Sequence, residues 1–194
     1  MGSAQVKNSI WKRISSALFY VVAGLLLLYI FSELFMPAQT IKIFQFKPYV
    51  VVTESMEPVI NVNDLIIDVR PNLDNLEVGD IITFNADIDY NGTKEVVTHY
   101  IYSIGENIDG ERTFRTVRNG GTIPDNWILT DADILGRYAF RIPKLGNVIN
   151  FVKSPFGIGT IAVNVIIIGT IVYIIKSSKR KEEPKENANE DKQQ

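Results

Sequence analysis

Two long hydrophobic stretches enclose a middle region in which hydrophobic and polar residues alternate over short distances. The first stretch, residues 14–36, carries one charged residue, Glu33, close to its end. The second, residues 156–175, carries no charge and is interrupted only by Asn164, two threonines and glycines. About 20 apolar residues are enough to cross the hydrocarbon core of a bilayer. Each stretch therefore predicts a transmembrane helix.

A cleaved secretory signal is the alternative for the first stretch, because Lys7, Lys12 and Arg13 precede it like the basic start of such a signal. The hydrophobic run is longer than the about 7 to 15 residues typical of a signal. P-A-Q-T at 37–40 is also not a small-x-small cleavage site. We therefore expect the first stretch to be retained in the membrane.

Basic residues flank the outer ends of both stretches, at 7, 12 and 13 before the first and at 176, 179, 180 and 181 after the second. Positive charge beside a span marks the cytoplasmic side. The chain is therefore predicted to be a multi-pass protein of the cell membrane with both ends in the cytoplasm. The predicted parts are a cytoplasmic N-terminus (1–13), a transmembrane helix (14–36), an extracytoplasmic β-rich domain (37–155), a transmembrane helix (156–175) and a charged, disordered cytoplasmic tail (176–194).

Short runs rich in Val, Ile, Phe, Tyr and Thr recur through the middle region, separated by turn-forming sequences such as N-V-N-D and D-Y-N-G. This pattern is typical of β-strands and predicts a mainly β domain. Asn91-Gly92 favours a tight hairpin. The predicted strands are 49–53, 65–69, 81–84, 96–104, 114–117 and 135–142.

The composition narrows the kinds of site and partner. With no cysteine the exported domain contains no disulfides, and at about 115 residues it is large enough to bury one core without them. A formal net charge of −2 argues against a nucleic-acid partner, whereas the two spans imply a lipid bilayer as partner. One histidine and no cysteine leave too few ligands for a catalytic zinc, so we expect no metal and no cofactor.

The sequence T-E-S-M-E-P at 53–58 places a serine at the end of the first predicted strand. We expect Pro58 to stop that strand, because proline supplies no ladder donor, and to leave Ser55 exposed. A serine hydroxyl becomes a nucleophile when a base takes its proton, and the one histidine is His99, in V-V-T-H-Y-I. A solvated turn serine and a structural strand histidine are the alternative. Met56 is expected either in the core or on a surface facing membrane or substrate.

These residues belong to a series of motifs that resembles, in order, the sequence boxes of type I signal peptidases. T-E-S-M-E-P resembles the S-G-S-M-E-P box, and V-V-T-H-Y-I (96–101) the V-T-H-R-I box. The other similar segments are N-V-N-D-L-I-I-D-V (61–69), E-V-G-D-I-I-T-F (77–84), T-V-R-N-G-G-T-I-P-D (116–125) and L-G-R-Y-A-F-R-I-P-K-L-G-N-V-I-N-F (135–151). The resemblance runs from the first span to the second, and several ordered boxes are more specific than any one of them.

With a histidine at the position of the base, the sequence resembles the ER-type branch of this family, which includes the SipW-like enzymes. The resemblance implies a curled β domain between two transmembrane helices, with Ser55 as nucleophile, His99 as general base and Asp125 as the final acid. It also implies a serine endopeptidase that removes signal peptides from preproteins, close to the membrane surface. Thr53 and the backbone N–H of Ser55 are candidate oxyanion donors, although Thr53 is also compatible with an ordinary strand residue.

Three positions depart from the boxes: Glu54 replaces a glycine, Tyr100 an arginine, and V-R-N at 117–119 the sequence K-G-D. Asn119 could still orient the His99 ring through its amide oxygen, but it carries no charge. Asp125 is then the one box acid left to assist the base.

Two other functions stay open at this point. The altered boxes are compatible with a weak or inactive membrane-anchored β domain that binds or scaffolds other proteins. A Ser-Lys peptidase using Lys94 is disfavoured, because Lys94 lies in a polar turn where nothing would desolvate its amine.

Overall fold

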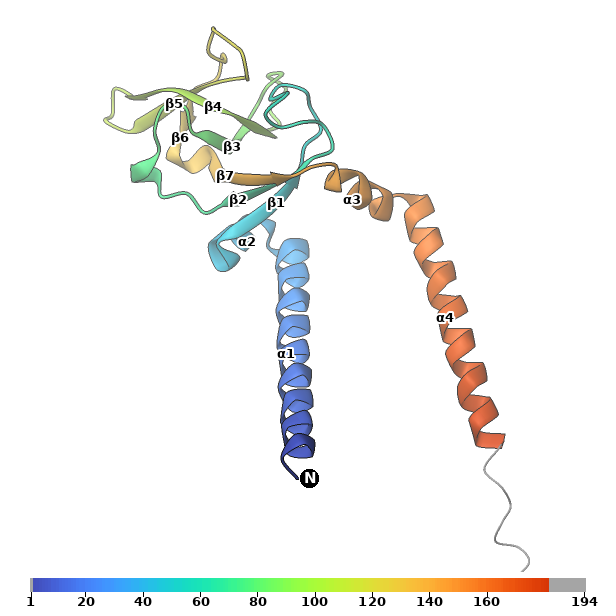
Figure 1. Ribbon diagram of the computed structural model, residues 1–194. Coiled ribbons are helices and arrows are strands. Elements are labelled where there is room, and N and C mark those ends of the chain that lie inside the picture. The colour runs from blue at the N-terminus through green and yellow to red at the C-terminus, as the bar shows by residue number, and fades with distance from the viewer. Residues whose placement is uncertain (1, 182–194) are drawn as a thin grey trace, which may run out of the picture. The chain divides into compact units, whose positions relative to one another are not determined.

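The computed structural model describes residues 2–181, and its central feature is one antiparallel sheet of seven strands (Figure 1). The order across the sheet is β1-β2-β7-β3-β4-β5-β6. The strands are β1 (Phe46–Val50), β2 (Leu65–Val69), β3 (Ile81–Ala86), β4 (Glu95–Glu106), β5 (Arg112–Val117), β6 (Leu129–Thr130) and β7 (Ile134–Ile142). The prediction of a mainly β domain is confirmed, and only the two-residue β6 has no counterpart among the predicted strands.

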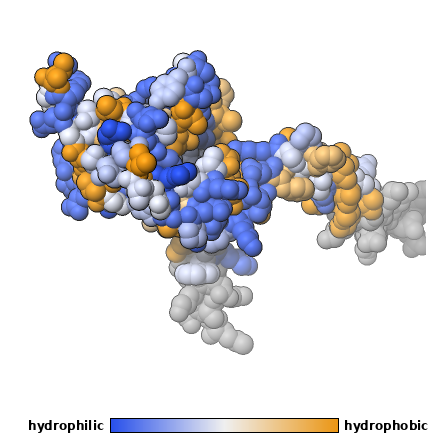
Figure 2. Space-filling model, turned by 90° about the horizontal axis from the view of Figure 1, so that it is seen from above, coloured by the Kyte–Doolittle hydropathy of each residue, from blue (hydrophilic) through white to orange (hydrophobic). Residues whose placement is uncertain are grey.

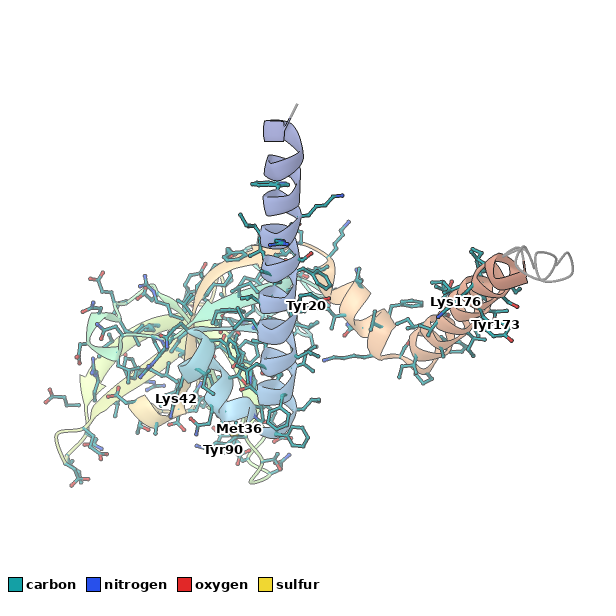
Figure 3. The ribbon with its side chains drawn as sticks, turned by 90° about the horizontal axis from the view of Figure 1, so that it is seen from below. Tyr20, Met36, Lys42, Tyr90, Tyr173 and Lys176 are labelled. Atoms are coloured by element: carbon teal, nitrogen blue, oxygen red, sulfur yellow. The ribbon has the colours of Figure 1, made fainter. Side chains whose placement is uncertain are left out.

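Two long helices flank the sheet in the sequence, α1 (Gly2–Phe35) and α4 (Pro155–Lys181). Within them, Trp11–Phe35 and Pro155–Ser177 are long and apolar enough to cross a membrane. Figure 3 shows the side chain of Tyr20 projecting from α1 and that of Tyr173 from α4. Residues 176–181 of the predicted disordered tail continue α4 as helix, and 182–194 lie outside the described residues.

Two shorter helices, α2 (Pro37–Phe44) and α3 (Leu145–Lys153), lie inside the predicted β-rich domain, in segments for which no strand was predicted. Both are amphipathic. α2 buries Thr40 and Ile41. On α3 the exposed apolar side chains follow helical spacing, at Val148, Phe151 and Val152. With eight and nine residues, these helices are too short for their period to stand out from a sequence rich in β-type residues. Two single-turn 3-10 helices, Leu73–Asn75 and Asp131–Asp133, complete the elements.

The first strand ends earlier than predicted. β1 stops at Val50, and the chain then forms a loop in which Val51 donates its N–H to the Asp64 carbonyl at 3.0 Å and accepts from the Asn63 N–H at 2.9 Å. The side chain of Val52 is 76% exposed. The predicted strand over 49–53 is therefore wrong for 51–53, because this hydrophobic run lies partly at the surface.

The connection between β3 and β4 is a hairpin, but not a tight one. The register pairs Ala86 with Glu95, so residues 87–94 form the loop. The Asp87 carboxylate accepts hydrogen bonds from the backbone N–H groups of Asn91 and Gly92, at 3.0 and 2.9 Å. The prediction of a tight turn at Asn91-Gly92 is wrong, because Asp87 folds these residues back into a wide loop.

Two groups of buried side chains form the core. The larger group joins β3, β4 and β5 and consists of Leu76, Ile82, Phe84, Ala86, Ile101, Phe114 and Leu129. The smaller group joins the segment after β1 to β2 and consists of Met56, Ile60 and Ile66. Burying such a side chain contributes about 1.5–3 kcal/mol, so each group holds its elements together. Met56 is 2% exposed, which decides between the two positions expected for it in favour of the core.

The end of α1 is attached to α2 and β1 by polar and aromatic contacts. Glu33, the one charge of the first hydrophobic stretch, pairs with Lys47 of β1 at 3.2 Å. The ring of Tyr29 stacks on Phe46 with 5.6 Å between centroids. Ser32 and Thr40 share a buried hydrogen bond of 3.1 Å. These contacts fix the position of the first strand on the end of the first helix.

Asp68 of β2 is a carboxylate buried inside the sheet domain. The residue is 0% exposed, and within the described part of the chain no hydrogen bond satisfies its carboxylate oxygens. Burial raises the pKa of Asp68 to about 6. Gly136 of β7 leaves the space, since a Cβ there would lie 2.7 Å from the Asp68 Cβ. Because the folded protein holds this proton more tightly than the unfolded chain, the stability from this group is complete at low pH and is lost as the pH rises through about 6.

We predict that Asp68→Asn weakens the pH dependence of stability. Between about pH 4 and pH 8 the wild-type carboxylate lowers the free energy of unfolding by on the order of 2 kcal/mol as it ionises, whereas an amide does not ionise. Thermal unfolding of both full-length proteins in detergent measures this slope. Asp109→Asn, at an exposed turn, is the control and should keep the wild-type slope. Equal slopes for Asp68→Asn and wild type would contradict the prediction.

Candidate active site

A cavity of about 460 Å³ lies beside the end of β1. Its walls are mainly hydrophobic and come from residues 49–53, from the turn that follows them, from residues 95–99 and from Trp127. Ser55 and His99 both line it. The face of the β domain seen in Figure 2 is mostly hydrophilic, broken by small hydrophobic patches. The fold therefore brings the predicted serine and histidine to one largely apolar cavity.

Ser55 lies in a turn and not at the end of a strand. The turn follows the loop after β1 and is anchored by Met56 and Ile60, which are both buried and joined by a backbone hydrogen bond of 2.9 Å. Pro58 lies inside this turn, well beyond Val50 where the strand ends. The prediction that Pro58 stops the strand is therefore wrong, because the buried side chains, and not the proline, hold Ser55 beside the cavity.

The hydroxyl of Ser55 is half-buried and lies 3.4 Å from the Thr53 hydroxyl. Thr53 is exposed and outside the strand, so an ordinary strand role does not account for it. Among the described residues, no acceptor takes the backbone N–H of Ser55. Both candidate oxyanion donors therefore lie at the same edge of the cavity.

His99 lies in the middle of β4, opposite Ile82 of β3, and is 5% exposed. Its Nδ1 is 2.7 Å from Oδ2 of Asp125. Since a carboxylate only accepts, Nδ1 carries the proton of this bond and Nε2 is the ring's acceptor in the neutral form. Trp127 stacks against the imidazole with 6.2 Å between centroids and an interplanar angle of 28°. The ring is thus held in one tautomer and one orientation.

Asp125 is fixed by the end of β5. Its Oδ2 also accepts from the Thr116 hydroxyl at 2.6 Å, and its backbone N–H donates to the Thr116 carbonyl at 2.8 Å. Arg115 donates to the Asp125 carbonyl at 2.8 Å. The indole N–H of Trp127 donates to the Thr116 hydroxyl at 2.9 Å, so this hydroxyl links the tryptophan to the carboxylate. Thr116 and Trp127 were not predicted as site residues, because their contacts depend on how the loop after β5 returns to that strand.

Ser55 and His99 are not joined directly. Within the described chain, the hydroxyl of Ser55 has its hydrogen bond with Thr53 and the ring of His99 has its bond with Asp125. Catalytic hydrogen bonds are often long in a protein without substrate and tighten in the complex. The shared cavity and the open Nε2 position are therefore the features that relate the two residues.

Lys94 does not take part in this arrangement. Its amine pairs with Asp133 at 2.6 Å, its side chain is 60% exposed, and it does not line the cavity. The Ser-Lys alternative accordingly has no geometric support.

Asn119 differs from its expected position. Its amide group donates from Nδ2 to the Glu57 carbonyl at 2.7 Å, and its backbone N–H donates to the Ser55 carbonyl at 3.0 Å. The interpretation that Asn119 orients the His99 ring is wrong. The residue reaches the serine turn, because the chain reverses immediately after β5.

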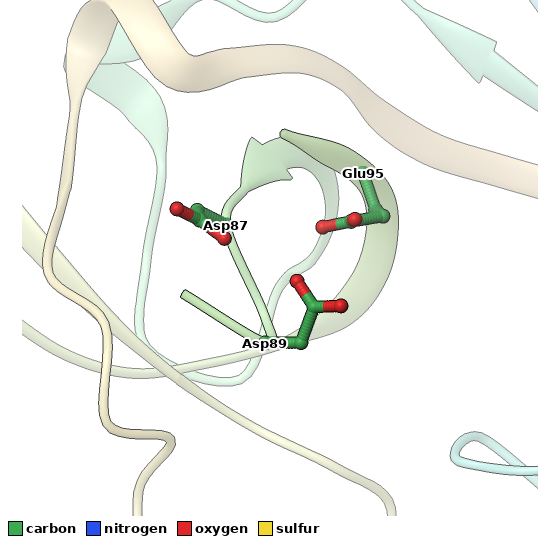
Figure 4. A group of neighbouring side chains, drawn as sticks. All are labelled: Asp87, Asp89 and Glu95. Atoms are coloured by element: carbon green, nitrogen blue, oxygen red, sulfur yellow. The ribbon is translucent and has the colours of Figure 1, made fainter. Parts of the chain in front are cut away.

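Three carboxylates, Asp87, Asp89 and Glu95, form a group beside the β3–β4 loop, with oxygens within 4.8 Å of one another (Figure 4). Their oxygens already accept hydrogen bonds inside the loop, for example from the Ile88 N–H to Glu95 at 3.2 Å. These bonds account for the loop conformation without an ion.

Comparison with known proteins finds similarity to one family over part of the chain. The family model described as signal peptidase, peptidase S26, matches residues 19–102. The matched segment contains Ser55 and His99, and it ends before Asn119 and Asp125. A comparison with curated proteins gave no match. The family match over residues 19–102, together with the fold and the cavity, supports a relation of this chain to the signal peptidases of family S26.

Proposed function

We propose that this protein is a membrane-bound serine endopeptidase of the ER-type branch, which removes signal peptides from preproteins with Ser55 and His99. The observation that carries the proposal is the His99–Asp125 hydrogen bond of 2.7 Å beside a cavity that Ser55 also lines. A scaffold protein would have no need for a buried imidazole held in one tautomer with its second nitrogen open. A structural histidine would have both nitrogens satisfied.

The proposed reaction is acyl transfer. Nε2 of His99 takes the proton of the Ser55 hydroxyl as Oγ attacks the scissile carbonyl, and the backbone N–H of Ser55 and the hydroxyl of Thr53 donate to the oxyanion. The imidazolium, stabilised by Asp125, then protonates the leaving amine as the C–N bond breaks. Water attacks the acyl-enzyme with His99 as base again. The carboxylic acid leaves and the proton returns to Ser55.

The cavity suits an extended peptide with small apolar side chains. Its walls carry Val51, Val97 and Ile66, and its rim carries the exposed Val52 and Val96. A peptide backbone beside residues 52–53, which follow the hydrogen-bonded Val51, can pair with their backbone groups, as in β-strand addition. These features match the segment that follows the hydrophobic helix of a signal peptide.

The membrane role rests on the two apolar helices and their basic flanks. We propose that α1 and α4 span the membrane with both ends in the cytoplasm and residues 37–155 outside. α3 leads into α4 with one residue between them, so its exposed apolar face at Val148, Phe151 and Val152 would lie near the lipid surface. The catalytic domain would then meet its substrate where the signal helix leaves the bilayer.

Ser55→Ala tests the nucleophile. The variant should insert and fold normally, since only one half-buried hydroxyl group is removed. It should lose preprotein cleavage. Gel analysis of a tagged preprotein incubated with purified enzyme measures the loss. Ser103→Ala, a serine of β4 that does not line the cavity, is the matched control and should cleave normally. Cleavage by Ser55→Ala at the wild-type rate would refute the proposed function.

Asp125→Asn tests the acid. The variant keeps the shape of the side chain but removes the charge that stabilises the imidazolium. We expect kcat to fall by a factor on the order of 10² to 10⁴ with little change in thermal unfolding. Steady-state kinetics on a signal-peptide substrate measure the fall, with Asp109→Asn as control. An unchanged kcat/KM at every pH tested would remove Asp125 from the mechanism.

The topology is tested by protease accessibility. Added to spheroplasts, protease should cut a tag inserted after Tyr90, in the exposed β3–β4 loop, and should leave a tag after Gln194 intact. Lysis of the spheroplasts should make both tags accessible. Digestion of the C-terminal tag before lysis would contradict the two-span arrangement.

A further inference from the structure

The turn that carries Ser55 is attached to the loop between β5 and β6 by one residue. Asn119 donates its backbone N–H to the Ser55 carbonyl at 3.0 Å and its side-chain N–H to the Glu57 carbonyl at 2.7 Å. The two acceptors lie on either side of Met56, whose side chain is buried in the core. The backbone of the turn is therefore held in two ways: by the two hydrogen bonds from Asn119 and by the burial of the Met56 side chain in the core.

The backbone after β5 is shaped to present both donors of Asn119. Val117 is the last residue of the strand and is buried. Gly120 has a positive φ of 68°, and the N–H of Gly121 donates to the Arg118 carbonyl at 3.0 Å. A Cβ on Gly121 would lie 2.8 Å from the Val117 side chain, so the turn closes tightly on the strand end. This tight reversal aims Asn119 away from the sheet and towards residues 55–57.

The same loop carries the acid of the site. Asp125 follows Asn119 along the chain and holds the imidazole of His99, as Asn119 holds the serine turn. One connection between two strands thus contacts both the nucleophile's backbone and the base. This matters because Ser55 and His99 have no direct hydrogen bond in the described chain, so their separation is determined by what each is attached to.

We propose that Asn119 is a positioning residue for the nucleophile: it fixes the distance of Ser55 from His99 by clamping the carbonyls of Ser55 and Glu57. The inference rests on the proposed function. Asparagine suits this position better than an acid, because its side chain donates to the Glu57 carbonyl and an ionised carboxylate supplies no donor. The departure from the family's K-G-D sequence at 117–119 would then be an adaptation of the clamp rather than the loss of a catalytic acid.

The test compares Asn119→Ala, which removes the side-chain donor, with Asn119→Asp, which places a carboxylate oxygen against the Glu57 carbonyl. A small misplacement of reacting groups lowers the rate by up to about 10²-fold, so we expect kcat to fall about 10-fold for alanine and further for aspartate. KM should stay within about twofold, because no cavity side chain changes. The pH at which activity is half-maximal should not move, since the His99–Asp125 pair is untouched.

The matched control is Asn107→Ala, at the other end of β5. Asn107 also bonds within a turn, with Nδ2 donating to Glu111 at 3.0 Å, but it lies away from the cavity. This variant should lower the unfolding temperature without lowering kcat. A purely structural role for Asn119 would give the same result as Asn107→Ala.

Hydrogen–deuterium exchange of the full-length protein in detergent gives a second readout that needs no activity. Exchange in residues 54–60 should be faster in Asn119→Ala than in wild type, and unchanged in Asn107→Ala. Wild-type kcat in both Asn119 variants, or unchanged exchange in 54–60, would overturn the inference. If Ser55→Ala cleaves like wild type, the proposed function fails instead, and the exchange result alone then decides whether the clamp exists.

Discussion

The hydrogen bond between His99 and Asp125 is the interaction on which the rest of the site depends. His99 is nearly inaccessible to solvent and lies in the middle of a strand, where an unpaired ring nitrogen would be costly. Asp125 satisfies that nitrogen, and Thr116 satisfies Asp125 in turn. The network lies at the pairing of β4 with β5, which places Tyr100, the residue after His99, opposite Val117 at the end of β5. A shift of that register would move the acid away from the base.

Ser55, the proposed nucleophile, and His99, the proposed base, are held by different parts of the fold. Ser55 depends on a turn packed by Met56 and Ile60 in the smaller hydrophobic group. His99 depends on β4, whose neighbours fill the larger group. These are two different parts of the core, and each is stabilised mainly by its own burial. The loop between β5 and β6 contacts both, through Asn119 at the serine turn and Asp125 at His99.

The elements that follow from local patterns could be predicted, and those that follow from distant contacts could not. The run 96–104 is rich in β-branched and aromatic residues, and 135–142 has Tyr138, Phe140 and Ile142 at alternate positions; they form β4 and β7 nearly as expected. Val51 and Val52 are also β-branched but lie in the loop after β1, where Val51 bonds to the backbone of Asn63 and Asp64. No local signal distinguishes the two cases.

The residues of the site also divide into those that a local sequence pattern predicts and those that depend on distant contacts. Ser55, His99 and Asp125 could be proposed because each lies in a motif that resembles a known box. Trp127, Thr116 and the true contacts of Asn119 depend on how one loop returns to the sheet. A loop's path is determined by where its few side chains find partners, and that information is not periodic in the sequence. The residues that tune the site are therefore harder to find than the residues that react.

The attachment of α1 to β1 has a mechanical consequence. Glu33 and Lys47 join the last turn of α1, a helix apolar enough to span a membrane, to the strand whose continuation forms one wall of the cavity. A helix tilts when the thickness of its bilayer changes. Because this ion pair connects α1 to β1, a tilt of α1 would also move β1. The cavity would then change its height and angle relative to the lipid surface. The thickness of the surrounding membrane would then act as a physical control on which bond of an arriving chain reaches Ser55.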